Sequence, residues 1–525
     1  METGSSGALR SGPVRMPVYT ALYLLACTVF LYAFVFVPPF TPFEISNIGD
    51  SLLYLSAGLR MFQGQLIYRD FFEFITPGMA LVHVALFKLF GVRPWIPNLL
   101  VILIGLGMVS IGVAIARRLM SPALALLPSA AFLVGARELL CDPVHHWYSM
   151  LAGLLAILVL LECRTPTRIA LAGAFCGISA SFTQTRGFSA YVGVAVYLIW
   201  EAWSHRQEWR TALQRQALLF GSAVAVFLLI NGYFIWKAGP ERYFWCVVVF
   251  VLKYYPKEAD WNTFAAFYNY VPHLAFTRAA LYDVSMWVFW FILNPLAYVA
   301  FFISYLRNSR RLTPQQWARP MLVAVVGLFI FLCVAPAPNP NRMSVSILPA
   351  LILLVWLISK AARLRRWIIS ACVTVIVITA LHDSFRRRPE RAGLFLTPGG
   401  PVMLTTQSTL EEYSWVQEHT HPGDYFYEAD FPDMYFYLGL RNPTGLPRAV
   451  NNGYTTMQQV TDAIGRLEEI KPRYIYWGQG DPLVVPSWED PADAHLQFML
   501  DYIGTHYRRA QRFPYDDEIW ERIAP

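Results

Sequence analysis

The sequence predicts a polytopic α-helical membrane protein that ends in a small α/β domain. Hydrophobic residues make up 56% of the 525 residues and charged residues only 15%, whereas water-soluble domains carry about 25% charged residues. Apolar runs long enough to cross a bilayer recur between Pro17 and Leu381. The 7 cysteines all lie in or beside these runs, so no disulfide framework is predicted for the polar C-terminal part.

About eleven segments have the length and hydrophobicity of membrane spans. With the N-terminus in the cytoplasm, every inside turn is basic and the short outside turns are poorer in Lys and Arg, as the positive-inside rule requires. The first span can act as an uncleaved anchor. The predicted spans are residues 17–38, 98–116, 122–136, 147–161, 169–182, 188–203, 217–236, 284–306, 321–335, 345–359 and 367–381.

Two other apolar stretches are predicted as interfacial segments. Residues 78–90 are short for a span and Lys88 interrupts them. A span at this point would also move every later basic turn to the outside. Residues 243–252, within the outside loop 237–283, form the second such segment. The first loop, residues 39–97, and the C-terminal domain are therefore predicted to lie on the outer face.

The polar end of the chain predicts a second domain, residues 391–525, after a membrane domain of residues 1–390. Residues 397–401, Thr-Pro-Gly-Gly-Pro, are predicted to belong to a linker. Ser408 and Glu411 have the spacing of a capping box that opens a helix. Further helices are predicted over 460–470 and 494–503, strands over 425–429 and 474–477, and a hairpin over 508–522.

Asp50 is the first candidate for a catalytic group. It lies in the first outer loop, directly before a stretch in which Leu52, Leu55 and Leu59 recur at helical spacing. Asp is a favoured helix N-cap, worth roughly 1 kcal/mol, and a cap alone would account for it. An ionised carboxylate at the membrane face is costly, which favours a functional role. The sequence leaves both interpretations open.

Asp142 and His145 form a second candidate group with the same ambiguity. Asp142 precedes Pro143, which suits the first position of a helix, so Asp142 can be a cap. His145 lies one turn on and shares its helix face. One Asp and one His are weak spacing for a metal site, and the chain has no Cys-x-x-Cys pair. Whether a divalent metal ion serves as a cofactor stays open.

Two arginines in predicted outside turns are candidates for holding an anionic group. Arg186 and Arg342 each lie between two apolar spans. Guanidinium groups bind phosphate with two parallel hydrogen bonds. Snorkelling towards lipid headgroups would explain the same positions.

Three acidic residues add negative charge to the first loop. Glu44, Asp70 and Glu73 are predicted to be mostly solvated loop charges. Asp70 is also a candidate for binding an acceptor or for orienting Asp50, and His145 is a second candidate for such a role.

Short motifs in two outside loops carry a family resemblance. The first loop contains Gly49-Asp50 and then Tyr-Arg-Asp-Phe-Phe at residues 68–72, and a later outside turn contains Asn341-Arg342. These motifs resemble the GT-C membrane glycosyltransferases, in particular the bacterial relatives of the protein O-mannosyltransferases and of the lipid A aminoarabinose transferases. Ser51 departs from the pattern, because many relatives carry Glu after the Asp.

The resemblance implies a glycosyltransferase of the bacterial plasma (inner) membrane. Its donor would be a sugar on polyprenyl phosphate, its acceptor a hydroxyl of a glycan, lipid or protein, and the anomeric centre would be inverted at the outer face. Asp50 would be the catalytic base and Asp142 the second acidic residue, while Arg186 and Arg342 would bind the donor phosphate. Membrane lipids are expected partners and nucleic acids are not.

Two other classes of protein remain open on the sequence. A polytopic transporter or lipid flippase of envelope glycans would also have many spans, but it would more often carry charges inside them and show two related halves. Here the charges gather at the outer ends of the spans and no paired halves are visible. A catalytically silent scaffold protein of the envelope would tolerate the loss of Asp50.

Overall fold

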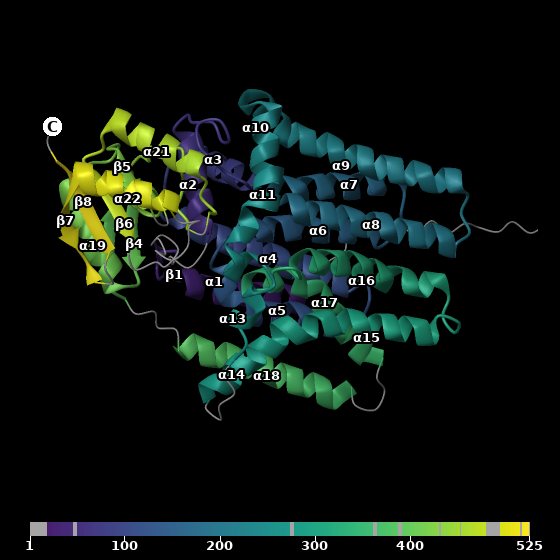
Figure 1. Ribbon diagram of the computed structural model, residues 1–525. Helices are drawn as coiled ribbons and strands as arrows, with labels where there is room; N and C mark the ends of the chain where they lie inside the picture. The colour runs from purple at the N-terminus through teal and green to yellow at the C-terminus, as the bar shows by residue number, and fades with distance from the viewer. Residues whose placement is uncertain are drawn as a thin grey trace, which may run out of the picture.

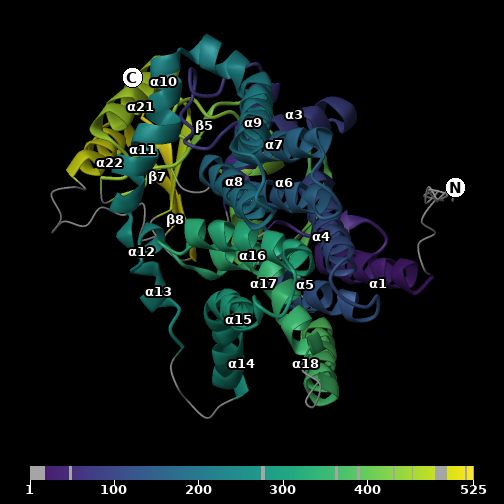
Figure 2. The same ribbon diagram turned by 90° about the vertical axis from the view of Figure 1, so that its right-hand side faces the viewer.

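The chain folds into a bundle of long helices with an α/β unit against one end of the bundle (Figure 1). Seen along the bundle, the helices appear end-on and the α/β unit lies behind them (Figure 2). The computed structural model describes residues 18–45, 50–272, 278–360, 365–386, 391–429, 432–451, 453–478, 494–514 and 517–523. Gly49, which belongs to the first motif of the family resemblance, lies outside the described residues.

A helix lies at the position of each predicted span. Those that bear on the site are α1 (Val18–Val35), α4 (Trp95–Ala116), α5 (Leu127–Leu140), α6 (His145–Leu160), α7 (Pro166–Phe182), α8 (Gln184–Ser204), α9 (Trp209–Ala238), α16 (Pro314–Val334), α17 (Pro340–Lys360) and α18 (Arg365–Arg386). A continuous helix, Tyr282–Asn308, joins α14 (Arg278–Trp287), the π-helical turn η4 (Val288–Ile292) and α15 (Leu293–Asn308).

Within the described residues, 6 helices are long and apolar enough to cross a membrane: α1, α4, α9, the continuous helix 282–308, α16 and α17. The chain is therefore a polytopic helical membrane protein, as predicted, while the larger number of spans stays a prediction.

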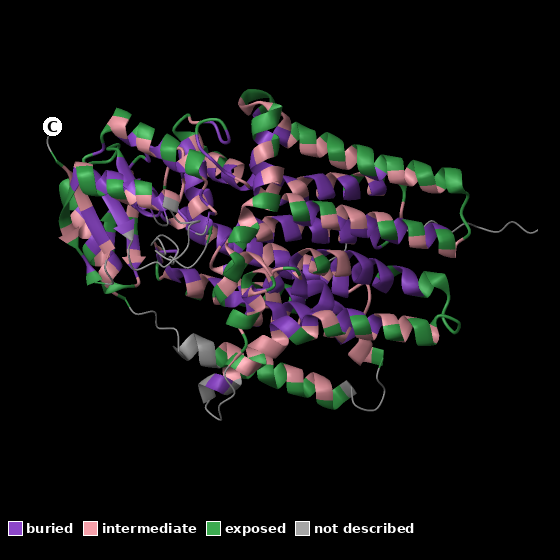
Figure 3. Cartoon of the chain, viewed as in Figure 1, coloured by how far each residue is buried: buried purple, intermediate pink, exposed green. Residues whose placement is uncertain are grey.

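The helices pack closely inside the bundle, and the outer face of the bundle is apolar. Gly173 and Gly177 of α7 lie against the backbone of α9, where no Cβ atom would fit. Buried residues fill the centre of the bundle, whereas the outer face of α9 is exposed (Figure 3). Leu229 on that face is 82% exposed, as expected for a surface that contacts lipid.

The predicted inside turns that lie within the described residues are at the end of the bundle that is remote from the α/β unit (Figure 1). Arg118 and Arg319, from two different turns, both form ion pairs with Glu162, at 2.7 and 2.8 Å. Arg319 also donates a hydrogen bond to the backbone oxygen of Arg118. These contacts hold three basic turns together on one face.

The outer loops form the opposite end, next to the α/β unit. In the first loop, α2 (Ser51–Phe62) and α3 (Gly78–Phe90) pack closely where Gly58 meets His83. Residues 78–90 are thus a separate short helix, which also contacts α7. The predicted interfacial segment 243–252 is the helical run α10 (Pro240–Phe244), η2 (Trp245–Val249) and α11 (Phe250–Lys253), followed by α12 (Ala259–Asn262) and α13 (Ala266–Asn269).

A mixed four-stranded sheet organises the α/β unit. Its order is β5 (Phe426–Glu428), β6 (Tyr474–Gly478), β8 (Asp517–Arg522) and β7 (Tyr507–Arg512), with only β5 and β6 parallel. The helices are α19 (Gln407–His419), α20 (Met434–Leu438), α21 (Met457–Ile470) and α22 (Ala494–His506). The strands and helices predicted after residue 425 are all present in the described residues.

Two expectations for the start of this unit are wrong. Residues 397–401 are not a linker but the turn of a hairpin between β3 (Gly393–Thr397) and β4 (Gly400–Leu404), with Gly400 at φ 131°. The backbone of Glu44 donates to the oxygen of Met403, so the hairpin docks on the first loop. The N-cap of α19 is Thr406 and not Ser408, because the Thr406 hydroxyl accepts from the amide of Thr409.

Candidate active site

Four separate parts of the chain enclose a cavity of about 350 Å³ at the outer-loop end of the bundle. We call it the Asp50 cavity. These parts are the first loop, the segment 255–270, the start of α17 with Asn339 before it, and residues 446–459 of the α/β unit. Its polar and aromatic lining includes Asp50, Tyr54, Glu73, Tyr255, Glu258, Asn262, Asn339, Arg342, Arg448 and Tyr454.

Asp50 turns its carboxyl group into this cavity. It occupies the N-cap position of α2 but makes no side-chain capping hydrogen bond, so the interpretation as a mere helix cap is wrong. The residue is exposed, yet the surface it exposes lines the cavity, and protein therefore surrounds the carboxyl group. Burial raises the pKa of Asp50, and the charges of Arg448 and Arg342 offset this in part.

Asp142 performs the capping that Asp50 does not. Its Oδ1 accepts a hydrogen bond from the backbone amide of Ser51, the first residue of α2, at 3.2 Å. Asp142 does not cap the helix that follows it, because α6 begins at His145 with Val144 at the N-cap. Burial raises the pKa of Asp142 to about 7, and the charge of Asp50 adds to the rise. The hydrogen bond from Ser51 lowers this pKa and offsets part of the rise. Asp142 thus lies beside Asp50 and holds the start of α2.

His145 lies behind the cavity wall, where it supports Tyr54. Its ring meets that of Tyr54 edge-on at 4.7 Å between centroids, and its Nδ1 is 3.1 Å from the Thr183 hydroxyl oxygen. Among the described residues, no three His, Cys, Asp or Glu side chains converge as metal ligands. Asp142 and His145 therefore do not fit a metal site.

Arg342 places a positive charge at the cavity wall, and its hydrogen bonds go to neutral oxygen atoms. Its Nη1 donates to the backbone oxygens of Trp261 and Ala337 at 2.7 and 3.1 Å. Its Nη2 donates to the Tyr255 hydroxyl at 2.7 Å and to Asn262 Oδ1 at 2.6 Å. No carboxylate among the described residues forms an ion pair with it. The guanidinium group is thus held in place with its charge available to an anion.

Arg186 lies deeper, at the start of α8. It is buried, and within the described part of the chain its Nε and Nη1 atoms have no hydrogen-bond partner. It is close enough to Arg342, Tyr54 and Tyr255 to interact with them electrostatically, although it does not itself line the cavity. A buried guanidinium with unused donors beside a second arginine is unfavourable unless an anion joins them.

The α/β unit contributes residues that sequence reasoning missed. Arg448 and Tyr454 line the cavity, and Arg448 provides the larger of the two charge effects that lower the pKa of Asp50. Tyr454 packs against Phe250 and Tyr255, with centroids 5.2 and 6.2 Å away. Nothing in the local sequence around residue 448 marks it, because its role depends on the docking of the unit.

Two acidic residues of the cavity were also missed or misassigned. Glu73 is buried rather than solvated, and its Oε1 accepts from the amides of Phe74 and Ile75 at 2.8 and 3.1 Å. Burial raises the pKa of Glu73 and of Glu258 to about 7 in each case. The charges of Arg448 and Arg342 favour the ionised form of both Asp50 and Glu258, whereas Glu73 has only backbone amides to offset its burial.

The other acidic residues of the first loop lie away from the cavity lining. Asp70 forms an ion pair with Arg69 at 2.7 Å and accepts from the amide of Leu66. The hydrogen bond from Arg69 holds the pKa of Asp70 below its usual range. Glu44 is buried against Thr405 rather than solvated. The structure thus does not bring Asp70 to Asp50.

Comparisons with known proteins find this architecture in solved structures. ArnT from Cupriavidus metallidurans in the apo state aligns over 97% of this chain and 98% of its own, with a TM-score of 0.58 and 13% sequence identity. The same protein bound to undecaprenyl phosphate aligns over the same shares with a TM-score of 0.55 and 13% identity. No family model and no curated protein sequence matches the chain.

The chain therefore shares the fold of ArnT, which is the GT-C fold that the resemblance drawn from the sequence implies. Its likeness to ArnT extends over nearly the whole of both chains, including the part after residue 390.

Proposed function

We propose that the protein is a glycosyltransferase that moves a sugar from a polyprenyl-phosphate donor to an acceptor hydroxyl, with inversion, at the outer face of a bacterial inner membrane. One observation carries the proposal. Within a GT-C fold, the carboxyl group of Asp50 makes no capping hydrogen bond and shares a cavity with Arg342 and Arg448. A base and a phosphate site are thus side by side, as this reaction requires.

Asp50 is the base of the proposed reaction. The acceptor oxygen attacks the anomeric carbon from the face opposite the phosphate while its proton passes to the Asp50 carboxylate. The bond between that carbon and the phosphate oxygen breaks, and the phosphate leaves with the electron pair. Asp142 keeps Asp50 in place through its hydrogen bond to Ser51 and is a positioning residue in this scheme.

Arg342 and Arg186 are the proposed phosphate-binding residues. The negative charge on the leaving phosphate increases as the bond breaks, so fixed guanidinium donors stabilise the transition state. Arg342 is preorganised by four neutral oxygens, and Arg186 has unused donors behind it. A solved structure with the same fold is bound to undecaprenyl phosphate, which supports a lipid-linked phosphate as the ligand.

The basic turns at the remote end support the proposed orientation, because Lys and Arg concentrate on the cytoplasmic side. Cysteines placed at Gln63 and Glu418, both exposed, in a Cys-free background should react with an impermeant thiol reagent in intact spheroplasts. A cysteine at Ser309, exposed in a turn at the remote end, should react only after lysis. The reverse labelling pattern would contradict the orientation.

The pH dependence of transfer should reveal the effect of Arg448 on Asp50. The base acts only when ionised, and below its pKa the rate falls about tenfold per pH unit. The Arg448 charge lowers the pKa of Asp50, so Arg448→Ala should raise that pKa. The acidic limb of kcat/KM against pH should then move to higher pH. The control Arg441→Ala, exposed on the same unit, should leave the limb unchanged; an equal shift in both would count against the assignment.

A further inference from the structure

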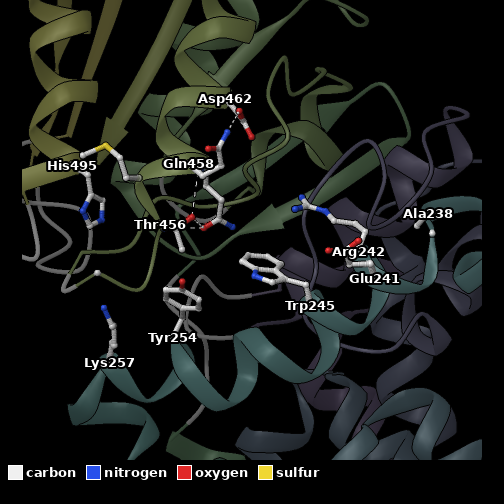
Figure 4. A pocket seen from close by; sticks show the side chains of 14 residues that line it. Ala238, Glu241, Arg242, Trp245, Tyr254, Lys257, Thr456, Gln458, Asp462 and His495 are labelled. Atoms are coloured by element: carbon white, nitrogen blue, oxygen red, sulfur yellow. Dashed lines mark hydrogen bonds between the residues drawn. The ribbon is translucent and has the colours of Figure 1, made fainter.

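A second cavity, of about 910 Å³, lies between α10–α11 and the α/β unit (Figure 4). We call it the outer groove. It is larger and more open than the Asp50 cavity. One wall comes from residues 238–257 and the other from residues 453–462 together with His495.

The outer groove adjoins the Asp50 cavity. Gln459 lines both. Two consecutive residues also line different cavities: Tyr254 lines the outer groove and Tyr255 lines the Asp50 cavity. A molecule lying in the groove would therefore have one end next to the proposed base.

Gln459 is held at this junction by a capping box. Its Oε1 accepts from the backbone amide and the hydroxyl of Thr456 at 2.9 and 3.0 Å. The side-chain amide therefore has one fixed orientation, with Nε2 on the opposite side from Thr456. Within the described residues Nε2 donates no hydrogen bond, so it is a ready donor at the point where the two cavities meet.

The groove carries balanced charges, unlike the Asp50 cavity. Arg242 and Lys257 are matched in number by Glu241 and Asp462. Gln458 donates to Asp462 at 2.8 Å, which fixes one of the acids. A lining with equal numbers of cations and anions does not select a charged ligand.

Two aromatic rings belong to the wall formed by residues 238–257. Figure 4 shows Trp245 and Tyr254 on the side of α10–α11, opposite Thr456 and Gln458 of the α/β unit. Trp245 packs edge-on against Phe72 at 5.9 Å between centroids. The Arg242 and Lys257 side chains lie over these two rings, 5.2 and 5.6 Å from the centroids, so both cations already have partners in the groove. Rigid rings together with amide and hydroxyl groups suit a ligand with apolar C–H faces and a rim of hydroxyls.

We infer that the outer groove is the acceptor site and that it binds a neutral carbohydrate, whose terminal hydroxyl passes Gln459 to reach Asp50. This inference rests on the proposed glycosyltransferase function and adds the chemical class of the acceptor to it. An acceptor recognised through phosphate or carboxylate groups would need an excess of basic residues, which the groove lacks.

The carbohydrate can be free or attached to a lipid, and the surroundings of the groove bear on this. Phe244 and Leu252, on α10 and α11, are 56% and 75% exposed. An amphipathic segment of this kind lies in the membrane interface. The groove would then open beside the headgroup layer, within reach of a glycolipid.

Glycan binding by the purified full-length protein tests the inference. An array of neutral and acidic oligosaccharides is probed in the absence of donor, with Gln458→Trp filling the groove. Thr461→Trp places the same side chain at another exposed position of α21 that does not line the groove. We expect neutral oligosaccharides to bind and Gln458→Trp to weaken this on the order of tenfold or more, with Thr461→Trp unchanged.

Three results would overturn the inference: binding of acidic glycans only, binding of no glycan, or equal binding by the two Trp variants. Equal binding of undecaprenyl phosphate by both variants shows that both are folded. A bound oligosaccharide is then compared free and as a glycolipid in phosphatidylcholine nanodiscs, and tighter binding in nanodiscs identifies the lipid-linked form. Since no transfer is measured, failure here is distinct from failure of the proposed function, which the Asp50→Asn protein tests.

Discussion

Asp50→Asn is expected to lower the rate of sugar transfer by roughly two to four orders of magnitude, the range for loss of a general base. Asn has nearly the shape of Asp, and the Asp50 side chain makes no capping hydrogen bond that could be lost, so the fold should be kept. The amide cannot accept the acceptor proton, which removes only the chemical step. Transfer from a synthetic polyprenyl-phosphate sugar, with binding of undecaprenyl phosphate measured in parallel, provides the test.

Asp142→Asn is the matched control for this prediction. The remaining amide oxygen can still accept from the amide of Ser51, so α2 and Asp50 should stay in place. We expect a much smaller loss of transfer than in Asp50→Asn, and a larger loss in Asp142→Ala, where the hydrogen bond is gone. Near-normal transfer by Asp50→Asn would refute the mechanism. A loss in Asp142→Asn as large as in Asp50→Asn would instead make Asp142 a second catalytic group.

Hydropathy was sufficient to place the helices of the bundle. A helix was found at each predicted span because a long apolar run has few other stable conformations in a membrane. The hairpin at residues 393–404 was mistaken for a linker, since Pro-Gly-Gly is equally compatible with both. The docking of β4 on residues 43–44, more than 350 residues away, favours the hairpin. No local sequence pattern predicts that contact.

The candidate site was predicted only in the parts that carry local signals. Asp50 and Arg342 stand out as charges beside apolar spans, and the structure brings both to one cavity. Arg448 and Glu258 have no such signal, because each becomes part of the site only when its loop docks. Glu44 and Glu73 were expected in solvent for the same reason. The α/β unit and the loop backbone bury them, and sequence composition does not predict either contact.

Arg342→Ala is expected to weaken the binding of undecaprenyl phosphate by roughly 10- to 100-fold, the effect of losing hydrogen bonds to a charged group. Four neutral oxygens hold the guanidinium at the cavity wall, and no carboxylate within the described residues neutralises it. Residual transfer at saturating donor is expected, because Asp50 is intact. Binding to protein in nanodiscs, measured by native mass spectrometry or with labelled lipid, gives the affinity.

Loss of the four hydrogen bonds could also disorder the loop, and two further variants separate this from loss of charge. Arg342→Lys keeps the charge without the planar fork of donors, and should fall between wild type and Arg342→Ala. Tyr255→Phe removes one partner of Arg342 and keeps the ring, so its donor affinity should change little. Arg93→Ala, which also removes an arginine that donates to a backbone oxygen at the outer-loop end, should have no effect. Donor affinity in Arg342→Ala equal to that in Arg93→Ala would remove Arg342 from the phosphate site.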